Sequence, residues 1–96
     1  MGNMSAIEAN PSIVDVCSGD EAIVTEIRWK VVDPAVDTVR IEITRVGDET
    51  RKVFYVGPPM GQMLTEKWVR TGMVFILINH RNDEVIDAIE MRGHSC

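Results

Sequence analysis

The chain has 96 residues, of which 45% are hydrophobic and 26% are charged, and its formal net charge is −5. This length allows one domain with one core, and the composition is that of a soluble globular protein and not of a disordered chain. The longest run of basic residues is the pair Arg51 and Lys52. Nucleic acid is therefore not expected as a partner, because phosphate backbones require clustered positive charge.

No segment of the sequence is predicted to insert into a membrane. The longest apolar run, "MVFILI" at 73–78, is far shorter than the roughly 20 residues of a spanning helix. The N-terminal "MGNMSAIEANPS" lacks the basic start and apolar stretch of a signal peptide. The sequence leaves the compartment unknown, and the missing signal peptide slightly favours the cytoplasm.

The first half of the chain alternates between apolar and polar residues, and this period of two predicts strands. We expect residues 1–8 to form a flexible segment and "IVDV" at 13–16 to be a short first strand. The stretch "AIVTEIRWKVV" at 22–32 predicts a half-buried strand. Its expected inward face consists of Ile23, Thr25, Ile27, Trp29 and Val31. A further strand is expected in "TVRIEITRV" at 38–46, with Val39, Ile41 and Ile43 facing inward.

The next segments predict a hairpin, a crossing loop and a central strand. After a turn at "GDET", the strand "KVFYV" at 52–56 is expected to place Phe54 and Tyr55 on opposite faces. The prolines of "GPPMGQ" predict a rigid loop that carries the chain to the other sheet, before a short strand at 62–65. The run "MVFILIN" at 73–79 is apolar at both parities, which is typical of a central strand covered on both faces.

The final strand is expected at 85–92, where Asp87 falls on the apolar parity. The other residues of that parity are Val85, Ile89 and Met91. Two arrangements would avoid a charge among apolar neighbours. Either a β-bulge near Asp87 switches the register, or Ile86 and Ala88 face the core first.

About seven short strands separated by turns predict an all-β fold, a two-sheet antiparallel β-sandwich at residues 9–92 followed by a tail at 93–96. The segments "EANPSIVDVCSGDEAIVTEIRW", "VRIEI", "VGPPMGQ" and "TEKWVRTGMVFIL" follow an order that resembles bacterial immunoglobulin-like (fibronectin III-like) β-sandwich domains. In that group a "GKWV..G..FYL" segment recurs near the end of the domain. Such domains are often appended to glycosyltransferases, methyltransferases and surface proteins, so the resemblance implies an accessory or interaction module without catalytic residues.

The resemblance also bears on Cys17 and Cys96. In an immunoglobulin-like sandwich, part of the first strand often runs parallel to the last, which places the ends of both strands at one pole. A disulfide between the two cysteines is one interpretation, and in an oxidising compartment it would stabilise the fold by about 4 kcal/mol. Two unrelated thiols are the other interpretation.

Tyr55 and Trp68 are the candidate binding residues. A ligand platform requires several exposed aromatic side chains on one face, and the chain holds two Trp, one Tyr and two Phe. The competing interpretation of Trp68 is a corner residue that packs under the preceding turn. Trp29 lies on the apolar parity of its strand and is expected in the core.

Residues with catalytic or metal-binding chemistry are spread along the sequence. A zinc site needs three or four converging ligands, whereas Cys17, His80 and His94 are far apart in the chain. Pairs of carboxylates lie in predicted loops and lack the spacing of a calcium-binding loop. Neither a nucleophile-elbow motif nor a phosphate-binding glycine loop is found. We therefore expect no enzyme activity, no cofactor and no metal.

These observations leave two hypotheses for function. The first is a non-enzymatic module that binds a protein partner or orients an attached enzyme domain. The alternative is a carbohydrate-binding module at a bacterial or phage surface. This alternative predicts that Tyr55 and Trp68 are exposed on a common face.

Overall fold

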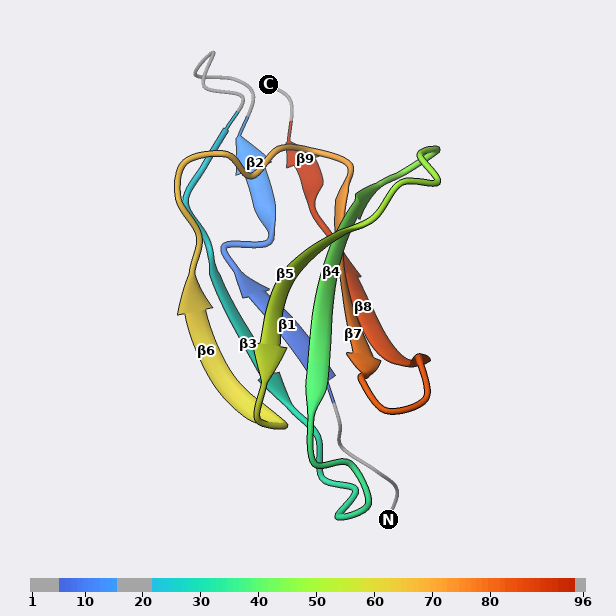
Figure 1. Cartoon of the computed structure of the whole chain (residues 1–96). Helices are drawn as coiled ribbons and strands as arrows, with labels where there is room; N and C mark the ends of the chain where they lie inside the picture. The colour runs from blue at the N-terminus through green and yellow to red at the C-terminus, as the bar shows by residue number, and fades with distance from the viewer. Residues whose placement is uncertain (1–5, 16–21, 95–96) are drawn as a thin grey trace.

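The computed structural model describes residues 6–15 and 22–94, in which two β-sheets face each other across one core (Figure 1). The strands in this part of the chain are β1 (Ala6–Asn10), β2 (Ile13–Asp15), β3 (Glu26–Lys30), β4 (Val39–Arg45), β5 (Lys52–Gly57), β6 (Met60–Leu64), β7 (Met73–Asn79), β8 (Glu84–Glu90) and β9 (Arg92–His94). The predicted all-β fold with antiparallel sheets is confirmed. No helix occurs among these residues, so none of them could span a membrane as a helix.

The strands form a three-stranded sheet in the order β1-β3-β6 and a four-stranded sheet in the order β5-β4-β7-β8, both antiparallel. The chain crosses from the second sheet to the first between β5 and β6, at the prolines where a crossing loop was expected. The short strands β2 and β9 pair in parallel. Cys17 and Cys96 lie outside the described residues, so their disulfide stays a prediction.

The core lies between the sheets and contains the alternate residues that the sequence assigned to it. Ile27 and Trp29 of β3 face Ile41 of β4 and Phe75 of β7, and all four side chains are buried. Trp29 Nε1 donates a hydrogen bond to the carbonyl oxygen of Pro58 at 3.1 Å. Trp29 therefore combines burial with a satisfied polar group, which is what a buried indole requires.

Strand β1 corrects the expected domain boundary. Ala6–Asn10 pairs with β3 in an unbroken antiparallel register, and Ile7 is buried, whereas residues 1–8 were expected to be a flexible segment. At the other end β9 extends to His94, two residues beyond the predicted end of the sandwich. The sequence signal for β1 is weak because Ile7 is the one large apolar side chain in the five-residue stretch "AIEAN".

A β-bulge in β5 corrects the predicted orientation of its aromatic residues. Ile41 pairs with Tyr55 and Glu42 pairs with Val53, which leaves Phe54 as an extra residue. An extra residue interrupts the alternation of faces. Phe54 and Tyr55 therefore do not lie on opposite faces: Phe54 contacts Phe75 and Tyr55 contacts Trp29, both within the core.

A second β-bulge lies beside Asp87, as in the first alternative, but it moves Val85 to the outer face and leaves Asp87 opposite the core residue Leu77. Leu77 pairs with Asp87 and Ile78 pairs with Val85, so Ile86 is the extra residue. The Asp87 carboxylate then points toward β1, where its Oδ2 accepts a hydrogen bond at 3.0 Å from the backbone N–H of Ile7. This bond joins one edge of each sheet.

Replacing this carboxylate should weaken the closure between β1 and β8. We expect Asp87→Ala to lower the free energy of unfolding by about 1 to 2 kcal/mol, because the part-buried amide of Ile7 loses its acceptor. Urea unfolding followed by circular dichroism measures the change. Glu90→Ala, an exposed acidic position on the same strand, is the control and should differ from wild type by less than about 0.5 kcal/mol. Equal stability of the two variants would contradict the role given to Asp87.

Candidate functional site

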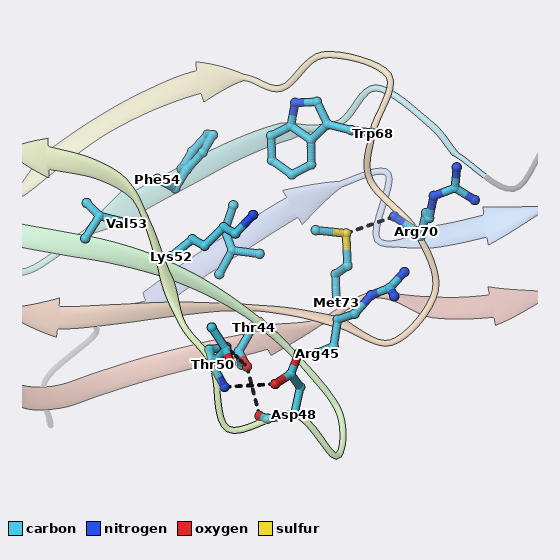
Figure 2. A pocket seen from close by; sticks show the side chains of 11 residues that line it. Thr44, Arg45, Asp48, Thr50, Lys52, Val53, Phe54, Trp68, Arg70 and Met73 are labelled. Carbon is cyan, nitrogen blue, oxygen red and sulfur yellow. Dashed lines mark hydrogen bonds between the residues drawn. The ribbon is translucent and has the colours of Figure 1, made fainter.

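The candidate site is a groove of about 580 Å³ between the β4–β5 hairpin and the β6–β7 loop. In Figure 2, Phe54 and Trp68 lie on one side of the groove, and the hairpin residues Thr44, Asp48 and Thr50 lie on the other. The volume is within the range of sites that hold small molecules or single side chains of a partner. The groove is therefore large enough to bind a ligand.

The apolar part of the groove is continuous with the protein core. The ring centroid of Trp68 lies 6.2 Å from that of Phe75, which is fully buried, and 5.9 Å from that of Phe54. Phe54 in turn lies 5.7 Å from Phe75 in an edge-to-face arrangement. Ile43, Val53 and Met73 are the other apolar residues of the lining. Because Phe75 anchors both outer rings, the aromatic surface keeps its shape without a ligand.

Two cationic side chains enter the groove from inward-facing strand positions. Arg45 continues the parity of Val39, Ile41 and Ile43 along β4, and Lys52 is paired with Ile43 across the β4–β5 ladder. Both residues are exposed and line the groove. Long cationic side chains commonly place apolar stems on apolar surface in this way.

A third cation, Arg70, lines the groove from the β6–β7 loop. Its backbone N–H donates to the Met73 sulfur at 3.2 Å, which fixes the loop against the start of β7. Among the described residues of the lining, Arg45, Lys52 and Arg70 are cationic and Asp48 carries a carboxylate. The described lining thus has more cationic than anionic side chains, although the whole chain carries a formal charge of −5.

The hairpin wall of the groove is held by its own hydrogen bonds. Asp48 Oδ1 accepts a bond from the Thr50 N–H at 2.9 Å, and the Thr44 hydroxyl lies 2.8 Å from the Thr50 carbonyl oxygen and 3.1 Å from that of Asp48. Gly47 adopts a φ of 84°, a left-handed conformation that glycine tolerates in tight turns. The wall is thus ordered independently of any ligand.

Comparisons with family models, with curated proteins and with solved structures give no significant match for this chain. The function of the site must therefore be inferred from the chemistry of its own residues. Within residues 6–15 and 22–94, no three His, Cys, Asp or Glu side chains are grouped closely enough to hold a metal ion.

The structure separates the two residues that the sequence proposed as a binding pair. Trp68 lines the groove, is partly exposed and also packs against the core. Its role as a binding residue stays a prediction. Tyr55 does not line the groove. Its ring lies 4.8 Å from that of Trp29 and covers Gly57, at the opposite end of β5 from Lys52.

Sequence reasoning missed Phe54, Arg45 and Lys52 as residues of the site. The signal was present for Arg45, because a strand with apolar residues at alternate positions ends with a cation at the same parity. Lys52 and Phe54 could not be placed because the bulge at Phe54 changes the faces of β5.

A separate polar cluster stabilises the outer face of the four-stranded sheet. Arg40 forms ion pairs with Asp83 at 2.6 Å and with Glu42 at 2.7 Å, and it lies 2.9 Å from His80 Nδ1. The hydrogen bonds to Asp83 and Glu42 raise the pKa of Arg40 above its usual value, so the guanidinium stays charged. Asp83 has a φ of 60° and is held at the turn by this pair. These contacts connect β4 with the β7–β8 turn, and His80 takes part in them.

Proposed function

We propose that the protein is a non-enzymatic, immunoglobulin-like module that binds a protein partner by strand addition along β6. The strand order β1-β3-β6 against β5-β4-β7-β8, with β2 parallel to β9, supports the immunoglobulin-like part of the proposal. The proposed binding mode rests on a difference between the β6 edge and the other three edges of the two larger sheets, which are β1, β5 and β8.

The two larger sheets have four edges, and three of these have features that oppose pairing with another chain. The N–H of Ile7 on β1 is bonded to Asp87, and the neighbouring β8 contains the bulge at Ile86. The β5 edge contains the bulge at Phe54. Bulges and inward-pointing charges are devices that protect edges from unwanted pairing. Strand β6 has neither, because Met60–Leu64 pairs with β3 without a register shift and "MGQML" contains no charge.

The free edge of β6 also offers backbone groups and apolar side chains together. The Val31 N–H donates to the Pro59 carbonyl oxygen, and the Thr65 N–H donates to the Thr25 carbonyl oxygen. Residues that bond to the neighbouring strand alternate along an antiparallel strand with residues that do not. The N–H and C=O groups of Met60, Gln62 and Leu64 therefore point away from β3. Met60 is 61% exposed and Leu64 is 67% exposed. An added strand would find main-chain partners and two apolar contacts on the same edge.

The test compares variants of β6 in an affinity capture from the source cell, with bound proteins identified by mass spectrometry. We expect Leu64→Lys and Gln62→Pro to weaken binding of the captured protein by about tenfold or more, because they add a charge to the edge or remove an outward donor. Val85→Lys changes an exposed valine on β8 and is the matched control, which should bind like wild type.

Hydrogen exchange on the complex gives a second readout. The amides of Met60, Gln62 and Leu64 should exchange rapidly in the free protein and slowly when the partner is bound. Retention of the partner by both β6 variants, or unchanged exchange at these amides, would show that the partner binds elsewhere.

The alternative is a carbohydrate-binding module, and the groove is the observation that favours it. Phe54 and Trp68 present partly exposed rings there, and such rings can stack on sugars. A glycan array tests this function. Binding to an uncharged glycan that is lost in Trp68→Ala would support it.

A further inference from the structure

We propose that the groove between the β4–β5 hairpin and the β6–β7 loop binds an acidic peptide segment, in which an apolar side chain is adjacent to a carboxylate. This site is distinct from the β6 edge and does not depend on strand addition there. Its lining includes the apolar side chains of Phe54, Trp68 and Met73 and the cationic side chains of Arg45 and Lys52.

Charge complementarity is the first argument for an acidic ligand. Among the described residues that line the groove, the strand residues Arg45 and Lys52 bring two positive charges and Asp48 brings one carboxylate, on a chain whose formal charge is −5. Clustering of like cations raises the free energy of the empty groove, and a carboxylate between them relieves this repulsion. The negative charge elsewhere on the chain disfavours a long polyanion, so a short acidic segment fits best.

The inward parity of Arg45 and Lys52 is the second argument. Residues at these positions would fill the core if the sandwich were closed here, as Ile41 and Ile43 do further along β4. The groove lining instead combines these cations with the aromatic rings of Phe54 and Trp68. A ligand that occupies it therefore meets an apolar surface and positive charge at the same time.

The polar groups of the groove favour a peptide over a glycan. Sugar hydroxyls need acceptors as well as donors, and arginine and lysine side chains have no acceptor. The acceptors Thr44 Oγ1 and Asp48 Oδ1 already bond to the hairpin backbone. Arginine and lysine supply donors suited to carboxylates. A side chain such as Phe or Leu can pack on Trp68 and Phe54 while a neighbouring Glu reaches the cations.

The experiment is a titration of the full chain, labelled with ¹⁵N, using the blocked tetrapeptide Phe-Glu-Phe-Glu as the probe. The indole N–H resonance of Trp68 should shift on binding, whereas that of Trp29, which is buried and bonded to Pro58, should not. The uncharged peptide Phe-Gln-Phe-Gln should bind about tenfold more weakly, and added salt should weaken the acidic peptide selectively.

The double variant Arg45→Gln/Lys52→Gln should reduce affinity for the acidic peptide by about tenfold. Lys30→Gln/Arg81→Gln removes the same charge from exposed residues outside the groove lining and should change affinity by less than about twofold. Leu64→Lys should leave peptide binding unchanged, which separates this site from the β6 edge. Equal binding of the two peptides, or tighter binding of a hexuronate tetrasaccharide, would overturn the proposal, as would an unshifted Trp68 resonance.

Discussion

Trp29→Ala should lower the free energy of unfolding by about 3 to 5 kcal/mol, the cost typical of a large core aromatic residue. The indole is 3% exposed, packs on Tyr55 and donates to the Pro58 carbonyl oxygen. It also covers Gly61, where an added Cβ would come within 2.8 Å of the ring. Its loss therefore affects β3, β5 and β6 together. A domain of this size has a total stability of about 5 to 14 kcal/mol, so the variant should be unfolded to a large extent in mild urea.

Trp68→Ala is the matched comparison for Trp29→Ala. Trp68 is partly exposed at the groove and packs against the core without lying at its centre. Its removal should therefore lower the free energy of unfolding by about half as much as the removal of Trp29, or less. Urea unfolding followed by near- and far-ultraviolet circular dichroism measures both variants. If Trp68→Ala were the more damaging change, the placement of Trp29 at the centre of the core would be wrong.

Thr65→Val should lower the free energy of unfolding by about 1 to 3 kcal/mol, although the substitution nearly preserves the shape of the side chain. The hydroxyl of Thr65 accepts a buried hydrogen bond at 2.9 Å from the Thr25 N–H, and valine has no acceptor. Thr25 is itself 1% exposed, and its hydroxyl donates to the Pro11 carbonyl oxygen at 2.6 Å. An unpaired buried amide is expensive because water cannot reach it.

Thr71→Val is the control for this substitution, since Thr71 is exposed in the β6–β7 loop. Its stability should stay within about 0.5 kcal/mol of the wild-type value. Thermal unfolding by calorimetry distinguishes the two variants. Slow exchange of the Thr25 amide in wild type and faster exchange in Thr65→Val would identify the lost bond directly, whereas equal stability of Thr65→Val and wild type would contradict it.

The alternation of side chains was enough to predict the fold class and most of the core. Ile27, Trp29 and Ile41 are buried where the period of two placed them, and "MVFILIN" is a central strand. Strand β1 was missed because "AIEAN" contains little apolar surface and gains its stability from pairing with β3. Local pattern does not report such tertiary contributions.

The groove was harder to predict because it depends on the bulge residue Phe54 and on Arg45 and Lys52, which lie where β4 ends and β5 begins. The bulge at Phe54 turns two adjacent aromatic side chains to the same side, and the alternation of apolar and polar residues does not indicate where a bulge lies. Arg45 and Lys52 come together through pairing across the hairpin and its bulge. Trp68 was identified, but its neighbours in the groove come from β4, β5 and β7, so only the folded chain brings them together.

The parallel pairing of β2 with β9 has a consequence for mechanical load. Strand β1 begins at one end of the molecule and β9 finishes at the other (Figure 1). Tension applied between Ala6 and His94 would therefore slide the two paired strands lengthwise past each other. The hydrogen bonds along Ile13–Asp15 would be strained at the same moment and would not open one after another. A molecule pulled in this direction resists extension better than one that is peeled apart from a sheet edge.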